Sequence, residues 1–333
     1  MLNLAEIRPR PGMVPEKFEP LAREIFALKK QLNAVILAHN YQVPEIQDAA
    51  DFVGDSLGLA RQAARTRADV IVFCGVHFMA ETAKILNPDK IVVLPDKNAG
   101  CSLEESCPAD ELAKLQATNP NFWTIAYINC SAAVKALSDV IVTSGNAERI
   151  VAAAPRDRDL LFVPDENLGQ WVMEQTGRPM TLWKGNCYAH VEFQRENILE
   201  LRRQFPDAKV VVHPESLREV RELADAVAST EKMISYCQTS PARRFVIVTE
   251  SGIIHRMRKE CPGKEFLCAP AFDVMRAPTD HCRCSECKYM KLNTLEKVLA
   301  CMKNLAPRVE LPRDILQRAR LPIDRMLEIS AKP

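Results

Sequence analysis

The chain has 333 residues, enough for two or three domains, and 47% of them are hydrophobic, enough to fill the cores of such domains. Its 44 Lys and Arg residues against 43 Asp and Glu residues leave a net charge of +1, which excludes a global basic field that would hold nucleic acid or an anionic membrane. Any anionic ligand is therefore expected to bind locally.

The first residues of the chain do not resemble a secretory signal. Residues 1–13 carry Glu6, Arg8 and Arg10 where such a signal needs an apolar stretch, and no later run reaches the roughly 18 apolar residues of a membrane span. We therefore expect a cytoplasmic protein with no membrane partner. Because the cytosol keeps thiols reduced, metal binding or catalysis explains the twelve cysteines better than disulfides do.

Short runs rich in Val and Ile follow along the chain and predict buried parallel strands. They cover residues 34–38, 69–74, 90–94, 123–128, 139–142, 159–163, 209–212 and 244–248. Helical patterns with polar faces lie between them, at residues 46–66, 131–137, 192–204 and 215–226. This alternation of strands and helices predicts an α/β fold.

The alternation repeats three times along the chain. The first strand of each repeat ends in two polar residues two positions apart: His39 and Tyr41, Tyr127 and Asn129, His213 and Glu215. A hydroxyl follows 17 residues after the first member of each pair: Ser56, Ser144 and Thr230. An aspartate precedes each hydroxyl by five residues: Asp51, Asp139 and Asp225. Each repeat finally reaches a candidate cysteine: Cys101, Cys187 and Cys287.

The repeated polar residues predict one shared ligand site. In open α/β sheets, ligands bind beyond the carboxyl ends of the strands, where side chains project from the loops between strands and helices. We expect three pseudo-threefold-related domains with these ends facing a central active-site cavity. Their expected boundaries are residues 1–104 together with 290–333, residues 105–188 and residues 189–289.

The three cysteines are one short of the set that closes a structural zinc site or an electron-transfer cluster. A [4Fe–4S] cluster held by three thiolates keeps one iron open. Such an iron is a Lewis acid that binds a carboxylate or hydroxyl of a substrate and helps to expel water. The pattern therefore predicts a catalytic cluster that does not serve electron transfer.

The run at residues 282–287 leaves a second interpretation open, because its three cysteines and His281 could form a zinc site. This interpretation lacks a second pair of cysteines. It also leaves Cys101 and Cys187 unexplained.

Several side chains at the strand ends suit proton transfer. Glu215 beside His213 suits a general base or proton relay, or else a solvated carboxylate at a helix start. Tyr41 and Tyr127 suit proton donation to leaving hydroxyls, and as core residues they would need hydrogen-bond partners. The three repeated hydroxyls lie near helix starts, so they are either N-caps or parts of an anion site.

An ordered set of motifs resembles the quinolinate synthase family over nearly the whole chain. The motifs are His39-Asn-Tyr41-Gln, Gly54-Asp-Ser56, Leu94-Pro-Asp-Lys-Asn-Ala-Gly-Cys101-Ser, Tyr127-Ile-Asn129, Thr143-Ser144, Pro164-Asp-Glu-Asn-Leu-Gly169, Gly185-Asn-Cys187-Tyr-Ala-His190, His213-Pro-Glu215 and Cys287-x-x-Met290-Lys-x-Asn293. The resemblance implies three stacked α/β/α, Rossmann-like domains. It also implies a three-cysteine [4Fe–4S] cluster with one open iron on Cys101, Cys187 and Cys287.

The resemblance further implies a transferase of de novo NAD biosynthesis. Iminoaspartate and dihydroxyacetone phosphate would condense, lose water and cyclise to quinolinate, with release of phosphate. L-aspartate oxidase, which makes iminoaspartate, is an expected transient partner, and nucleic acid is not. A [4Fe–4S] hydro-lyase of another small acid and a zinc-bound interaction module remain the alternatives.

Residue roles carried over from the family are expectations. The side chains expected to line the cavity and bind substrate are His39, Tyr41, Ser56, Tyr127, Asn129, Ser144, His190, His213, Glu215 and Thr230. The catalytic residues expected among them are His39, Tyr41, Tyr127, His213 and Glu215, with Tyr41, His213 and Glu215 as the acid–base groups. The expected holders of carboxylate or phosphate are Ser56, Asn129, Ser144 and Thr230.

The chain departs from the family pattern at a few positions. Ser216 stands where many relatives have cysteine, and Ala189 stands where valine is usual. Cys282 and Cys284 resemble the extra cysteines of some relatives, but their spacing from Cys287 differs. This spacing argues against a redox switch between Cys284 and Cys287, and it does not affect the cluster ligands.

Overall fold

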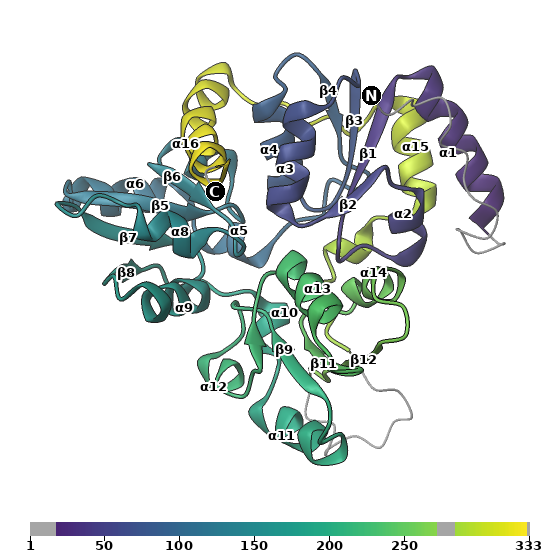
Figure 1. Cartoon of the computed structure of the whole chain (residues 1–333). Coiled ribbons are helices and arrows are strands. Elements are labelled where there is room, and N and C mark those ends of the chain that lie inside the picture. Colours follow the sequence, from purple (N-terminus) through teal and green to yellow (C-terminus); the bar gives the residue numbers. More distant parts are fainter. Residues whose placement is uncertain (1–17, 272–283, 332–333) are drawn as a thin grey trace.

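The structure is a computed structural model that describes residues 18–271 and 284–331 (Figure 1). Within these residues, three lobes each contain a sheet of four parallel strands. The first sheet consists of β1 (Ala34–His39), β2 (Phe52–Gly54), β3 (Val70–Cys74) and β4 (Ile91–Val93). The second consists of β5 (Phe122–Tyr127), β6 (Val140–Val142), β7 (Asp159–Val163) and β8 (Thr181–Leu182). The third consists of β9 (Lys209–Val212), β10 (Ala226–Val227), β11 (Arg244–Val248) and β12 (Glu265–Cys268).

The three sheets share one topology. Their strand orders are β2-β1-β3-β4, β6-β5-β7-β8 and β10-β9-β11-β12. In chain order, each sheet therefore places its second strand on one edge, then its first, third and fourth. The α/β class and the threefold repetition predicted from the sequence are confirmed at this level.

The sequence missed four strands, and all four lie at sheet edges. They are β2, β8, β10 and β12, which have two to four residues and partly exposed side chains. Two to four residues with partly exposed side chains form too short an apolar pattern to distinguish such a strand from a loop. The eight predicted strands bury more side chains, and each of them forms.

The helices surround these sheets. The first lobe has α1 (Glu19–Gln31), α2 (Pro44–Ala49), α3 (Ser56–Arg65) and α4 (His77–Leu86). The second has α5 (Ser102–Ser106), α6 (Ala109–Thr118), α7 (Ala132–Ala136), α8 (Ala147–Ala152) and α9 (Glu166–Thr176). The third has α10 (Tyr188–Val191), α11 (Arg195–Gln204), α12 (Arg218–Arg221), α13 (Thr230–Thr239) and α14 (Ile253–Glu260). The chain ends in a 3-10 turn, η4 (Met290–Leu292), and two helices, α15 (Leu295–Asn304) and α16 (Arg313–Ala331).

Two helix predictions are wrong. The single helix expected at residues 46–66 divides into α2 and α3, because β2 lies between them and pairs with β1. The Asp55 side chain starts α3 by accepting a hydrogen bond from the Gly58 amide at 2.7 Å. The helix expected at residues 215–226 is reduced to α12, because β10 occupies the end of that segment.

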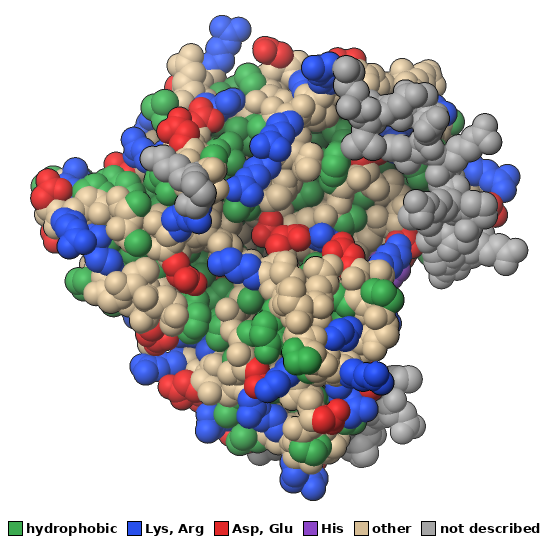
Figure 2. All heavy atoms as spheres, viewed as in Figure 1, with side chains coloured by type: hydrophobic (Ala, Val, Ile, Leu, Met, Phe, Trp, Pro, Cys, Tyr) green, Lys and Arg blue, Asp and Glu red, His purple; other side chains and the backbone are tan. Residues whose placement is uncertain are grey.

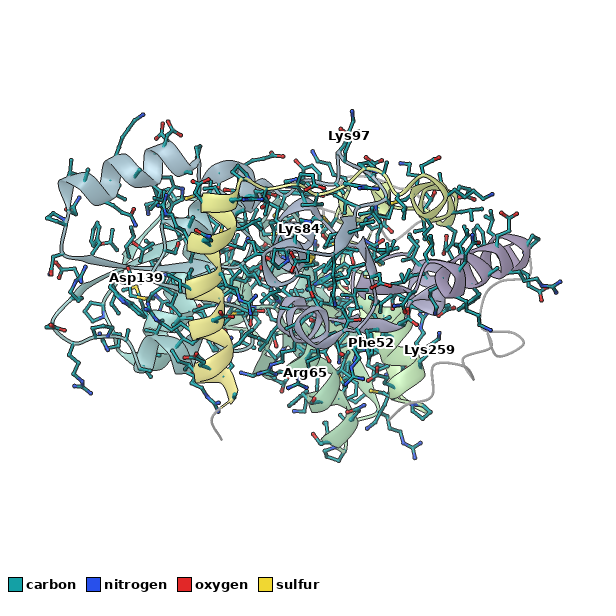
Figure 3. All side chains as sticks on the ribbon, turned by 90° about the horizontal axis from the view of Figure 1, so that it is seen from above. Phe52, Arg65, Lys84, Lys97, Asp139 and Lys259 are labelled. Carbon is teal, nitrogen blue, oxygen red and sulfur yellow. The ribbon has the colours of Figure 1, made fainter. Side chains whose placement is uncertain are left out.

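The repeated aspartates have a structural role. Each accepts a hydrogen bond from a backbone amide of the first strand, 15 residues earlier in the chain: Asp51 from Ile36 at 2.8 Å, Asp139 from Thr124 at 2.7 Å, and Asp225 from Val210 at 2.9 Å. Each aspartate amide also donates to the carbonyl of that same residue. The three aspartates thus attach the segment before each edge strand to the middle of its sheet. Figure 3 shows Asp139 beside α16.

The two C-terminal helices pack on different lobes. α15 packs against α1 of the first lobe, whereas α16 packs against α7 and β6 of the second lobe and against α4 of the first. The assignment of residues 290–333 to the first domain therefore stays a prediction. None of the described helices is both long and apolar enough to cross a membrane.

Candidate active site

One cavity lies where the three lobes meet. Residues from all three repeats line it, at the carboxyl ends of the strands. All the side chains expected to bind substrate, to transfer protons or to hold the cluster line this cavity: His39, Tyr41, Ser56, Cys101, Tyr127, Asn129, Ser144, Cys187, His190, His213, Glu215, Thr230 and Cys287. The structure therefore brings together residues that lie up to 248 positions apart in the chain.

The cavity lies next to a groove on the surface. Arg61, Gly145 and Lys232 line this groove, and Asp55 lines both the cavity and a branch of the groove. Basic and acidic side chains surround the hollowed middle of the molecule in Figure 2. Burial, with the nearby charge of Glu231, raises the pKa of Asp55 to about 6.

A chain of hydrogen bonds crosses the cavity wall. The Tyr41 hydroxyl lies 2.6 Å from Thr249 Oγ1, which lies 2.8 Å from His190 Nε2. His190 Nδ1 lies 2.8 Å from Glu215 Oε2, and the Tyr127 hydroxyl donates to Glu215 Oε1. All five side chains are at most 9% exposed, so these hydrogen bonds are shielded from bulk water.

Three ionisable groups that form these hydrogen bonds have shifted pKa values. Burial opposes the charge of Glu215, but His190 and His213 nearby, together with hydrogen bonds from His190 and Tyr127, hold its pKa below the ordinary value. Burial raises the pKa of Tyr41 and of Tyr127, and the charge of Glu215 adds to both shifts. At neutral pH the wall therefore presents an ionised carboxylate beside two protonated phenols.

Two further histidines of the cavity are neutral. Burial lowers the pKa of His39 and of His213 to about 3, although the charge of Glu215 opposes the shift. The His213 ring stacks on the His190 ring, with centroids 4.5 Å apart. Neutral imidazoles offer both a donor and an acceptor to a ligand.

The three repeated hydroxyls are not N-caps, which corrects one of the two sequence interpretations. The N-cap residues are Asp55 for α3, Asn146 for α8 and Ser229 for α13. Ser56, Ser144 and Thr230 instead line the cavity at or just before the first turn of each helix. The buried Asn129 amide oxygen has no hydrogen-bond partner within the described part of the chain, so it is available to a ligand.

The three candidate thiols reach the cavity from the starts of short helical segments. Cys101 precedes α5, Cys187 precedes α10, and Cys287 lies three residues before η4. Burial raises the pKa of all three thiols, and Cys101 and Cys287 add to the shift at Cys187. Backbone amides near Cys101 and Cys287 oppose the rise, as they would stabilise a thiolate ligand.

The described residues contain two compact groups of candidate ligands for a single metal ion. Thiolates around one zinc ion at 2.3 Å would lie about 3.8 Å apart. Among the described residues, the donor atoms that gather within 4.8 Å of one another form two groups, Cys187 with His190 and Glu215, and His77 with Glu81 and Glu104. The three thiols of the cavity are not one of these two groups.

The zinc interpretation of residues 281–287 rests partly on His281 and Cys282, which lie outside the described residues. Cys287 lines the same cavity as Cys101 and Cys187. This placement favours the set of three thiols that spans the repeats.

Two residues of the site, Thr249 and Glu250, lie outside the predicted motifs and directly follow β11. Both are fully buried. The sequence does indicate these residues, because the polar run 249–251 follows the carboxyl end of a predicted strand, where ligands bind in α/β sheets.

Glu250 connects a candidate cluster ligand to Tyr41. Its Oε1 lies 2.7 Å from Lys291 Nζ and accepts from the Cys287 amide at 3.3 Å. Lys291 Nζ in turn donates to the Tyr41 carbonyl at 2.7 Å. Burial raises the pKa of Glu250, and Lys291 opposes the shift.

Comparison with known proteins identifies the relatives of this chain. The family model described as "Quinolinate synthetase A protein" matches residues 23–328. A quinolinate synthase of Thermosynechococcus vestitus is 54% identical over 93% of this chain and 95% of its own length. The quinolinate synthases of Prochlorococcus marinus strain MIT 9303 and Cyanophora paradoxa are 52% and 50% identical, over 96% and 94% of this chain and 94% and 93% of theirs.

Proposed function

The chain belongs to the quinolinate synthetase A family, and from this premise we propose how its site produces quinolinate. Its function is quinolinate synthesis for NAD biosynthesis. We propose that it acts as a transferase on iminoaspartate and dihydroxyacetone phosphate, with quinolinate, phosphate and water as products. The observation that carries the proposal is the cavity that collects three thiols, two phenols and the Glu215 carboxylate from three repeats.

We propose that the three lobes are pseudo-threefold-related domains around this cavity. The shared strand order supports the proposal, as do the polar pairs that each first strand contributes. Such an arrangement surrounds a ligand with side chains from every repeat.

Cys101, Cys187 and Cys287 would hold a [4Fe–4S] cluster. Their placement on one cavity supports this assignment. When bound, the cluster supplies an iron without a protein ligand, which acts as a Lewis acid on a carboxylate or hydroxyl oxygen.

The protein side chains would supply the proton transfers. Each loss of water requires a base to accept a proton from carbon and an acid to protonate the leaving hydroxyl. The ionised Glu215 carboxylate is the proposed base, and the protonated Tyr41 phenol is the proposed acid. Tyr127 and His190, both bound to Glu215, fix the direction in which the carboxylate points.

The same cavity would bind anionic substrates. Ser56, Ser144 and Thr230 lie at the starts of three helices, where backbone amides and the helix dipole favour carboxylate or phosphate. The unpartnered Asn129 oxygen suits a hydroxyl or amino donor of a substrate.

The proposal is tested with anaerobically purified protein, iminoaspartate and dihydroxyacetone phosphate. We expect quinolinate and inorganic phosphate in equal amounts, together with iron and sulfide near four per chain. Dehydration of another small acid without quinolinate would identify a hydro-lyase. Stoichiometric zinc without iron would identify a zinc protein and refute the cluster.

A further inference from the structure

We propose that the side chains of Ser102, Tyr188 and Tyr289 form a collar that joins the three cysteine-bearing segments to one another and retains the cluster. The inference rests on the proposed cluster and concerns three residues that have no role in the proposed reaction. Ser102 and Tyr188 each directly follow a candidate ligand, and Tyr289 lies two residues after one.

The Ser102 hydroxyl links the first cysteine segment to the second. It donates to the Asn186 carbonyl at 3.3 Å and accepts from the Tyr188 amide at 3.3 Å. Asn186 and Tyr188 flank Cys187, so one side chain binds the backbone on both sides of this candidate ligand. Ser102 itself is the first residue of α5, directly after Cys101. These hydrogen bonds therefore hold the Cys101 segment against the Cys187 segment.

The Tyr188 hydroxyl links the second segment to the third. It accepts a hydrogen bond at 2.5 Å from the amide of Lys288, which directly follows Cys287. The hydroxyl has one proton to donate, and both the Glu286 carbonyl at 3.4 Å and the Cys287 side chain can accept it. A thiolate is the stronger acceptor because it is charged, so a deprotonated Cys287 would receive this proton. Tyr188 thus holds the third segment and stabilises its ligand.

The Tyr289 hydroxyl links the third segment back to the first. It donates to the Glu105 carboxylate, at 3.1 and 3.3 Å from the two oxygens. Glu105 lies on α5, and its amide donates to the Cys101 carbonyl at 3.0 Å. The Tyr289 ring also packs on Gly100, where a Cβ would lie 3.5 Å from the Tyr289 Cε1 atom. The three links therefore close a collar that includes the segments of all three candidate ligands.

The collar lies at the surface beside the candidate ligands. Its three side chains are half-buried, and the two tyrosine rings meet edge to face with their centroids 6.1 Å apart. The ammonium group of Lys288 lies over both rings, 5.5 Å from the Tyr188 centroid and 5.0 Å from the Tyr289 centroid. On this side the collar obstructs water, oxygen and chelators that approach the thiols. We therefore expect it to slow the loss of iron from the bound cluster.

Matched tyrosine variants test the collar. Tyr188→Phe and Tyr289→Phe each keep the ring and remove one link, whereas Tyr236→Phe, on α13 against Phe245, is the control. We expect anaerobically purified Tyr188→Phe to lose iron to a chelator on the order of 10–10²-fold faster than the native protein, because outer hydrogen bonds to metal ligands contribute about that much to affinity. Tyr289→Phe should show a smaller acceleration, and Tyr236→Phe should show none.

The reduction potential of the cluster separates the two collar tyrosines. A hydrogen bond to a ligand sulfur stabilises the more negative, reduced cluster, so Tyr188→Phe should make the potential more negative. Tyr289→Phe should leave it near native, because its hydroxyl binds a carboxylate. An unchanged potential in Tyr188→Phe would overturn the assigned hydrogen bond to Cys287. The free energy of unfolding in urea should stay near native in all variants.

Native rates of iron loss in both Tyr188→Phe and Tyr289→Phe would overturn the inference, and so would an equal acceleration in Tyr236→Phe. Should Tyr188→Phe not fold, Ser102→Ala opens the neighbouring link and replaces it in the comparison. Failure of the proposed function gives a different result. A native protein purified without iron and sulfide would refute the cluster, and the role of the collar would fall with it.

Discussion

Two sets of polar residues recur with the same spacing in this chain, yet they serve different regions of the molecule. Asp51, Asp139 and Asp225 lie before the edge strands and bind the backbone of their own sheets. The polar pairs follow the first strands and converge on one cavity. A polar residue can therefore recur in every repeat either because the fold requires it or because the ligand requires it. Its hydrogen-bond partner distinguishes the two cases, because a structural residue such as Asp51 binds the backbone of its own repeat.

Substitution of the cavity thiols is expected to reduce activity more than any other change in either region. Serine at Cys101, Cys187 or Cys287 should abolish the cluster and all activity, because two thiolates cannot anchor four irons. Iron and sulfide analysis and absorbance of anaerobic protein measure the loss. Cys282→Ser, outside the described residues, should retain the cluster. The opposite result for Cys282 and Cys287 would contradict the ligand assignment.

The acid–base groups should show the next largest effect. Glu215→Gln and Tyr41→Phe each remove a proton-transfer group while preserving shape, so kcat should fall about 10²–10⁴-fold with the cluster retained. Steady-state kinetics together with iron analysis of the same samples test this. Activity within a few-fold of native in either variant would assign that residue to packing.

The two regions should also differ in their response to pH. His39 and His213 have folded pKa values of about 3 against an ordinary value of 6.5, so the unfolded chain binds more protons between these values. Their contribution to stability is complete above pH 6.5 and is lost as the pH falls toward 3. The pKa of Asp225 is lowered from 3.8, because hydrogen bonds from Val210 and Lys209 outweigh burial, so it loses its contribution only at lower pH.

Urea unfolding from pH 7 to pH 4 separates these contributions. The free energy of unfolding should fall with pH in the native protein, and the slope should decrease in the double variant His39→Gln/His213→Gln. Comparing slopes avoids any constant loss of stability that the substitutions cause. An unchanged slope would assign the acid sensitivity to other groups.

The smallest effect on activity is expected at the structural aspartates. Asp139→Ala removes an acceptor of the Thr124 amide, so the free energy of unfolding should fall by about 1–3 kcal/mol while kcat remains near native. Ser144→Ala, five residues later, is the matched control, because it lines the cavity and should raise KM with little loss of stability. A reversal of these two patterns would show that the two regions have been assigned the wrong way round.

Local sequence patterns determined the central strands of the sheets and most residues of the cavity. Runs of Val and Ile predicted every strand that is buried in the middle of a sheet, because such strands have apolar neighbours on both faces. The spacing of polar pairs and cysteines predicted the residues that line the cavity, since these positions follow strand ends in every repeat. Short edge strands and the break between α2 and α3 escaped prediction, because these strands are held by pairing with β1, β7, β9 and β11.

The contacts between repeats were decided by the tertiary structure. Tyr41 and Thr249 are 208 positions apart, and their hydroxyls meet because the ends of β1 and β11 face one another across two lobes. Glu250 and Lys291 likewise act on Tyr41 and Cys287 only through the packing of the third lobe against the first. Periodicity is a local property that a chain carries before it folds, whereas a hydrogen bond between repeats depends on how buried surfaces of separate lobes fit together.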